Sequence, residues 1–284
     1  MTKLKERMGR RGVYVLPSLF TTMGLFAGFY ALIAAVQGRY ELAAWAIIAA
    51  AVFDMLDGRV ARLLHAETAF GAEYDSLCDM LSFGVAPAVL VYLWALIHLP
   101  ADLHQLAWLG SFFLVAGAAL RLARFNVQLE CQDKRYFQGL PTPGAALLIA
   151  TAVLYYEKTG FVPQPWLWLA VSLFLSWLMV SNVRFISGKD VDLKQRRSTG
   201  VLILMVMIIG MVMFDPYRVP FTVLFAYCLH GPLLSLWQNR RLSHYRRLRK
   251  MRKKARAASD GHHGQDKNQQ DTSEQDKDGG NGSV

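Results

Sequence analysis

Long apolar stretches constrain the fold of this chain more than any other feature of its sequence. Eight of them follow one another, at roughly 16–36, 41–63, 71–97, 106–126, 143–157, 166–186, 201–214 and 219–237. A bilayer core about 30 Å thick requires roughly 20 mostly apolar residues in a spanning helix. Only a helix satisfies all its backbone hydrogen bonds within one such segment. The sequence therefore predicts an all-α integral membrane protein.

The distribution of Lys and Arg predicts the orientation of these helices. With the N-terminus inside, the inner segments are 1–12, 59–70, 121–142, 184–200 and the tail from 238, and they hold 28 of the 31 basic residues. Only Arg39, Lys158 and Arg218 fall on the other side. Basic residues gather on the cytoplasmic side of membrane proteins. We therefore expect both termini in the cytoplasm, with the chain in a bacterial cytoplasmic (inner) membrane.

The C-terminal tail divides into a basic and a polar part. Residues 240–256 form a basic run, which could lie on the anionic leaflet or only fix the topology. Residues 259–284 are rich in Gln, Asp, Gly and Ser, and we expect them to be disordered. Because a neighbouring membrane accounts for much of the net charge of +10, no nucleic-acid partner is expected.

Four aspartates interrupt the second and third apolar stretches. Asp54 and Asp57 end one uncharged run, and Asp75 and Asp79 precede another. An ionised residue inside a membrane helix costs about 2.5–3.5 kcal/mol on insertion scales, so such residues are expected to be functional.

Helical geometry places these aspartates on two faces. Around the first helix four residues lie within about 80° of Asp54: Asp57, Gly58, Ala61 and Arg62. On the next helix Asp75, Cys78, Asp79 and Ser82 share a face with Gly71, whereas Glu73 points to the opposite side. Two antiparallel helices joined by a short turn would bring both acidic faces together.

Four neighbouring carboxylates require a cation between them. Hard carboxylate oxygens as the main ligands indicate Mg²⁺, Mn²⁺ or Ca²⁺ rather than Zn²⁺. Gly58 and Gly71 allow a ligand to approach the backbone closely, and the guanidinium of Arg62 suits a phosphate. A purely structural ion-pair cluster is disfavoured because four acids face one Arg. A divalent-cation carrier or channel would explain the carboxylates but would leave the glycines and Arg62 unused.

The spacing of eight residues across positions 54–79 resembles the signature of the CDP-alcohol phosphatidyltransferases. It reads Asp54-x2-Asp57-Gly58-x2-Ala61-Arg62-x8-Gly71-x3-Asp75-x3-Asp79. The resemblance implies a CDP-linked lipid donor, CMP as the leaving group, two divalent ions (Mg²⁺ or Mn²⁺) and a homodimer with six core helices per protomer. It also implies metal-ligand roles for Asp54, Asp57, Asp75 and Asp79, with Asp79 as the catalytic base. Asp54, Gly58, Ala61, Arg62 and Gly71 would bind CDP-diacylglycerol.

Further segments resemble the bacterial phosphatidylserine synthases, a branch of this family. These segments are 16–22, 73–88, 121–126, 137–146 and 179–185. Their resemblance implies L-serine as the acceptor, and phosphatidylserine and CMP as products. Glycerol 3-phosphate, or another small alcohol, is the alternative acceptor. Ser82, Arg121, Arg124 and Asn126 are the candidates for binding the acceptor or the lipid phosphate.

The expected domain organisation follows from these assignments. Residues 1–15 form a cytoplasmic juxtamembrane segment, and 16–190 form the six-helix catalytic core. Residues 191–237 would add about two transmembrane helices, and 238–284 form the cytoplasmic tail.

Overall fold

The computed structural model describes residues 2–64, 68–129, 137–181, 183–185 and 214–232. The chain divides into two units, Met1–Pro232 and Leu233–Val284, and every described residue belongs to the first. The expected cytoplasmic tail, 238–284, and most of the expected seventh span, 201–214, lie outside the described residues.

The first two helices form a hairpin packed through alanines. Helix α1 spans Thr2–Val36 and α2 spans Tyr40–Leu64, with Gly38 in the turn at φ +74°. Ala31, Ala34 and Ala35 of α1 are buried, as are Ala43, Ala44 and Ala50 of α2. Small side chains let helix backbones approach closely, which is how helices associate inside a membrane. The predicted spans 16–36 and 41–63 are both helical, although α1 begins well before residue 16.

The predicted single helix over 71–97 is divided into three parts. Helix α3 (Ala69–Asp79) leads into a π-helical turn (η1, Met80–Val85), and α4 (Ala86–Trp94) follows. Pro87 lies in the first turn of α4 and has no backbone N–H to donate. A wider turn just before it accommodates that loss, and π-turns of this kind often occur at functional sites. The π-turn begins immediately after Asp79.

Three further helices complete the core. Two short 3₁₀ turns (η2, Leu96–His98; η3, Ala101–Leu103) lead into α5 (His104–Leu129). Helix α6 (Thr142–Thr159) ends at Gly160, whose φ of +69° closes the helix, and α7 (Pro165–Val180) follows. The helix predicted at 166–186 is therefore too long, because Arg184–Phe185 (β2) pairs with Phe137–Gln138 (β1) in a two-stranded antiparallel ladder. Otherwise the described part of the chain is essentially all-α, as predicted.

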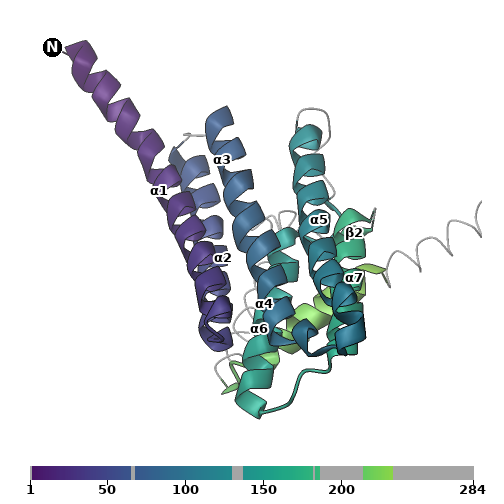
Figure 1. Cartoon of the computed structure of the whole chain (residues 1–284). Helices are drawn as coiled ribbons and strands as arrows, with labels where there is room; N and C mark the ends of the chain where they lie inside the picture. Colours follow the sequence, from purple (N-terminus) through teal and green to yellow (C-terminus); the bar gives the residue numbers. More distant parts are fainter. Residues whose placement is uncertain (1, 65–67, 130–136, 182, 186–213, 233–284) are drawn as a thin grey trace, which may run out of the picture. The chain divides into compact units, whose positions relative to one another are not determined.

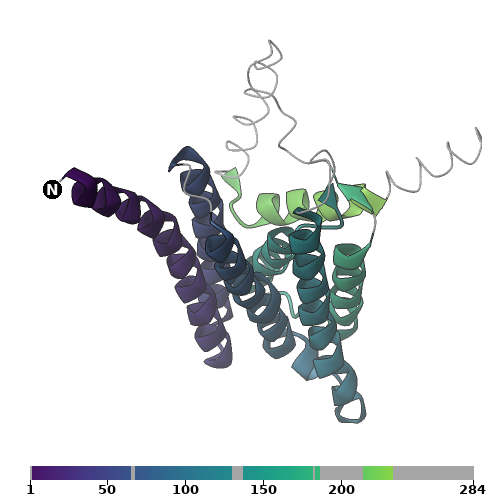
Figure 2. The ribbon, with the colours of Figure 1, turned by 90° about the horizontal axis from the view of Figure 1, so that it is seen from above.

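Helix α6 lies at the centre of this arrangement. Ten of its residues are buried, from Thr142 to Leu154. Figures 1 and 2 show α1, α2 and the α3–α4 segment beside one another, and α5 and α7 lie to the right of them in Figure 1. Residues 218–232 form a further helix, whose Cys228 is buried and whose Phe221 stacks on Tyr155 of α6 at 5.5 Å.

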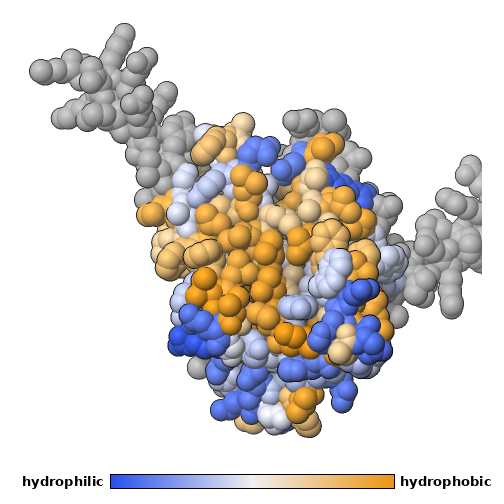
Figure 3. Space-filling model, in the orientation of Figure 1, coloured by the Kyte–Doolittle hydropathy of each residue, from blue (hydrophilic) through white to orange (hydrophobic). Residues whose placement is uncertain are grey.

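The described residues include three helical segments long and apolar enough to cross a bilayer. They are Ser18–Val36, Ala69–His98 and Ala101–Val127, and α7 is a shorter apolar helix. Many large apolar side chains of these segments face outward, such as Phe26, Leu77 and Leu120. Hydrophobic residues cover the middle of the face in Figure 3, while hydrophilic residues gather toward its lower edge. Such a distribution suits contact with lipid.

Candidate active site

Three aspartates from two helices converge at one point. Carboxylate oxygens of Asp54 and Asp57 on α2 and of Asp75 on α3 all lie within 4.8 Å of one another. The spacing of three between Asp54 and Asp57 puts both on one face of α2. The structure thus brings together the two acidic faces that the sequence predicts.

Asp79 lies beside this trio. It is one turn along α3 from Asp75, and its carboxyl group interacts with that of Asp54. All four aspartates line one small cavity of about 10 Å³, roughly the space of one water molecule or ion. The other residues that line it are Thr21, Gly24, Ala50, Cys78, Ser82 and Phe83.

The chemistry of this cavity fits a hard divalent cation. The described residues that line it include four acids and no Lys, Arg or His. Asp57 is only 5% exposed, and its Oδ2 has no hydrogen-bond partner among the described residues. Thr21 on α1 lines the cavity and interacts with the same carboxyl group. A buried, unpartnered carboxylate oxygen among other acids is costly unless a cation occupies the space between them. The cluster can therefore bind a divalent metal ion.

Of the residues predicted to bind the nucleotide-linked lipid, Asp54 lines the cavity, whereas the others do not. Gly58, Ala61 and Arg62 continue along α2 toward the 65–67 connection, and the Arg62 guanidinium lies 3.9 Å from where a Cβ at Gly58 would be. Gly71 is in the first turn of α3, where its N–H donates to Thr68 Oγ1 at 3.0 Å. A side chain at Gly71 would come within 3.1 Å of that capping hydroxyl. Arg62 is exposed, so its guanidinium is accessible to a phosphate.

Two of the four acceptor candidates reach the Asp79 end of the site. Ser82 lines the cavity, and its hydroxyl donates to the Gly24 carbonyl at 3.2 Å. Arg121 on α5 interacts electrostatically with Asp79 and donates from Nη1 to Thr142 Oγ1 at 2.5 Å. The Nε of Arg121 is buried without a hydrogen-bond partner among the described residues. A buried donor of this kind is available to an anionic ligand.

The other two acceptor candidates bind elsewhere in the protein. Arg124 donates to the Val180 carbonyl at the end of α7, at 3.4 Å. Asn126 exchanges hydrogen bonds with Ser76 on α3, at 3.1 and 3.2 Å. Both contacts tie α5 to neighbouring helices, and Ser76 directly follows Asp75 in the chain.

Several residues around the site were not singled out from the sequence. Thr21 contacts Asp57, and Thr142 contacts Arg121. Both lie in segments whose resemblance the sequence does reveal, 16–22 and 137–146. Tyr227, on the 218–232 helix, interacts electrostatically with Arg121, and no sequence signal marks it.

Comparison with known proteins agrees with this geometry. Residues 14–178 match the family model described as CDP-alcohol phosphatidyltransferase, and the match contains all four aspartates. The chain is 32% identical over 221 residues to the CDP-diacylglycerol–serine O-phosphatidyltransferase of Helicobacter pylori, covering 77% of this chain and 90% of the relative.

Two further relatives carry related names. A CDP-diacylglycerol–serine O-phosphatidyltransferase of Mycobacterium bovis is 30% identical over 237 residues, which cover 79% of this chain and 80% of the relative. The archaetidylserine synthase of Methanothermobacter thermautotrophicus is 34% identical over 178 residues, covering 60% of this chain and 69% of the relative. Both names include serine.

Proposed function

Because the chain belongs to the CDP-alcohol phosphatidyltransferase family, we propose that it transfers the phosphatidyl group of CDP-diacylglycerol to the hydroxyl of L-serine. The products are phosphatidylserine and CMP. The convergence of Asp54, Asp57 and Asp75 within 4.8 Å is the observation that carries the proposal, since these carboxylates could bind a divalent metal ion. Arg62, on the same helix as Asp54 and Asp57, is the proposed phosphate ligand. The names of the relatives support serine as the acceptor.

Asp54, Asp57, Asp75 and Asp79 are the proposed ligands of two divalent ions, Mg²⁺ or Mn²⁺, with Ca²⁺ as an alternative. When bound, such ions neutralise pyrophosphate oxygens and the charge that develops on departing CMP. Gly58, Ala61, Arg62 and Gly71 hold the cytidine diphosphate part, with Arg62 contributing a fork of donors to phosphate oxygens.

The protein's own groups position and deprotonate the acceptor. The serine hydroxyl oxygen attacks the phosphorus that carries diacylglycerol, and the bond from that phosphorus to the CMP oxygen breaks. Asp79 is the proposed base that takes the hydroxyl proton, because it interacts electrostatically with Arg121, the proposed partner of the acceptor. Arg121, positioned by Thr142, is the proposed partner of the serine carboxylate.

The contacts of the basic residues favour serine over glycerol 3-phosphate. A phosphate-bearing acceptor requires more positive charge than a carboxylate does. Among the described residues, Arg121 is the cation that interacts with Asp79, whereas Arg124 donates to the Val180 carbonyl. A single guanidinium is sufficient to pair with the single carboxylate of serine.

The protein is an integral membrane protein, and we propose that it resides in a bacterial cytoplasmic membrane with both termini in the cytoplasm. The concentration of Lys and Arg in the segments assigned to the cytoplasmic side supports this orientation. In this orientation the aspartates lie near the cytoplasmic surface. Serine and CMP would exchange there with the cytosol, while the lipid enters from the bilayer. Residues 16–190 form the proposed catalytic core, and a homodimer is the proposed assembly.

A CMP-release assay with purified protein in detergent tests the proposal. The assay contains CDP-diacylglycerol, Mn²⁺ or Mg²⁺ and one labelled acceptor at a time. Release with serine and not with glycerol 3-phosphate is the expected result. Release only with glycerol 3-phosphate would overturn the choice of acceptor. In proteoliposomes, divalent-ion flux without CMP release would support the carrier instead.

A further inference from the structure

A second polar cavity lies between the end of α6 and the start of the 218–232 helix. Its volume is about 410 Å³, far larger than that of the acidic cavity. It is lined by Tyr155, Lys158, Thr159, Phe161, Asp215, Tyr217 and Arg218. Helix α6 begins at Thr142, which contacts Arg121, and its 18 residues span about 27 Å. The cavity is therefore at the opposite end of α6 from the proposed active site.

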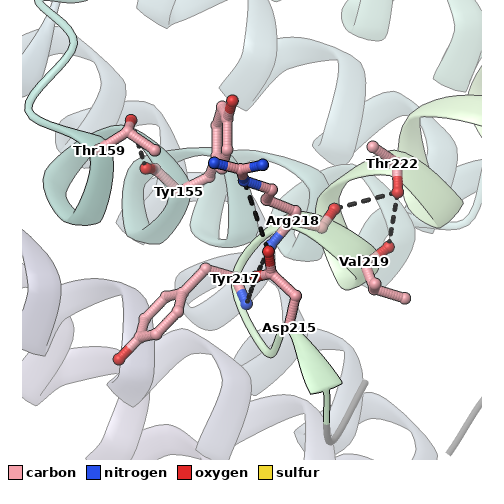
Figure 4. A network of polar contacts seen from close by, with 7 residues as sticks. All are labelled: Tyr155, Thr159, Asp215, Tyr217, Arg218, Val219 and Thr222. Carbon is pink, nitrogen blue, oxygen red and sulfur yellow. Dashed lines mark hydrogen bonds and ion pairs between the residues drawn. The ribbon is translucent and has the colours of Figure 1, made fainter. Parts of the chain in front are cut away.

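The residues around this cavity are held by a network of polar contacts (Figure 4). Asp215 Oδ1 accepts hydrogen bonds from the backbone N–H groups of Tyr217 and Arg218, at 3.2 and 2.9 Å. Asp215 Oδ2 forms an ion pair with Arg218 Nε at 3.4 Å. Figure 4 shows the guanidinium of Arg218 directed toward Tyr155 on α6. The ammonium of Lys158 lies 5.5 Å from the centre of the Tyr217 ring.

The charges in this cavity depart from the general charge pattern of the chain. In the proposed topology only Arg39, Lys158 and Arg218 lie on the outer side, and two of these three line one cavity. They come from helices about 60 residues apart in sequence. Asp215 offsets one of the two positive charges, so the cavity keeps a net charge of about +1. An anionic group is the ligand that this charge would attract.

One side of the cavity is apolar. Phe161, which lines it, is 64% exposed, and Val162, the next residue in the chain, is also exposed. Exposed aromatic residues at a membrane surface interact with the region between lipid headgroups and acyl chains. A phosphate next to an apolar wall of this kind matches a phospholipid better than it matches a free ion.

We propose that this cavity binds the phosphate of an anionic phospholipid from the outer leaflet, between Lys158 and Arg218. Tyr217 holds the Lys158 ammonium through its ring, and Asp215 keeps the start of the 218–232 helix, with Arg218, beside α6. The proposal concerns a site separate from the aspartate cluster, although it uses the same membrane topology. It does not depend on which acceptor the enzyme uses.

Native mass spectrometry of the full chain in detergent tests this site, with phosphatidylglycerol, phosphatidylcholine and inorganic phosphate as separate probes. Wild-type protein should retain phosphatidylglycerol in preference to phosphatidylcholine. The double variant Lys158→Gln/Arg218→Gln should lower that retention by at least about 10-fold. Arg39 is the third basic residue on the outer side and does not line the cavity, so Arg39→Gln should leave phosphatidylglycerol retention unchanged. Equal loss in both variants, or retention of inorganic phosphate without lipid, would overturn the proposal.

A second variant keeps the test decisive if the double variant folds poorly. Asp215→Asn keeps a side chain that can cap the helix but removes the negative charge that competes for Arg218. Phosphatidylglycerol retention should therefore rise, and unchanged or lower retention would contradict the site. Serine-dependent CMP release should stay near the wild-type level in all these variants, because the cavity is at the far end of α6. If the wild-type protein releases no CMP with serine, the enzymatic proposal fails, while the lipid-retention result still decides the proposed lipid site.

Discussion

Arg121 Nη1 on α5 donates a hydrogen bond to Thr142 Oγ1 at the start of α6, at 2.5 Å. Thr142 is completely buried, and the neighbouring Nε of Arg121 has no partner among the described residues. The threonine thus fixes the direction of the guanidinium while leaving one donor for a ligand near Asp79.

Replacing Thr142 should weaken serine binding more than it slows turnover. Thr142→Val keeps the shape of the side chain but removes the acceptor oxygen. We expect the KM for serine to rise by about 10-fold, since a hydrogen bond to a charged group contributes about 1.5 kcal/mol or more. Thr142→Ser keeps the acceptor oxygen, so its KM for serine should stay close to the wild-type value. The measurement is CMP release over a range of serine concentrations. An unchanged KM in the Val variant would remove Thr142 and Arg121 from the acceptor site.

Removing the buried carboxylate of Asp57 should weaken metal binding. In Asp57→Asn the unpartnered Oδ2 is lost as an anionic ligand, so affinity for Mn²⁺ should fall by at least about 10-fold. Isothermal titration of metal-free protein with Mn²⁺ measures this directly. Glu73→Gln is the matched control, because Glu73 is an exposed acid of α3 outside the cavity. If both variants bind Mn²⁺ like the wild type, the acidic cluster is not the metal site.

Asp79→Asn should remove nearly all turnover without unfolding the protein. The amide cannot accept the proton of the serine hydroxyl, and general-base catalysis typically contributes about 10²–10⁴-fold in rate. Single-turnover CMP release with saturating Mn²⁺ is the appropriate measurement, with thermal stability in detergent as the control for folding. A variant that keeps most wild-type activity under these conditions would show that another group acts as the base.

Gly28 should tolerate no side chain. A Cβ at Gly28 would lie 2.8 Å from Ser82 Cα, where α1 packs against the π-turn that follows Asp79. Gly28→Ala should therefore lower the unfolding free energy by about 1–3 kcal/mol and reduce activity by displacing Ser82 and Asp79. Gly24→Ala is the matched control on the same helix, since its Cβ would come no closer than 3.6 Å to its neighbours. Similar melting temperatures for the two variants would contradict this packing argument.

Much of the site could be predicted because its residues are close in sequence. Asp54 and Asp57 share a helical face through their spacing alone, as do Asp75 and Asp79. The short connection between the two helices then brings the faces together, and the carboxylates of Asp54, Asp57 and Asp75 do converge. Local geometry was sufficient for this part of the prediction.

Contacts between distant segments could not be predicted in this way. The roles of Thr21 and Thr142 depend on how α1 and α6 pack against α2 and α5, and no spacing rule reports that packing. The strand pairing of Arg184–Phe185 likewise depends on β1, which is more than 40 residues away in the sequence. Residues 186–213 and 233–284 lie outside the described part of the chain, so the expectations for them stay predictions.

The amino-acid sequence alone is sufficient to predict a helical chain in a membrane with four aspartates on two helical faces. These properties follow from composition and from the helical repeat, which act over a few residues. The contact of Arg121 with Thr142 and the shared cavity of Lys158 and Arg218 are visible only in the folded chain. Those pairs are 21 and 60 residues apart, and helix packing, which depends on the whole chain, brings them together.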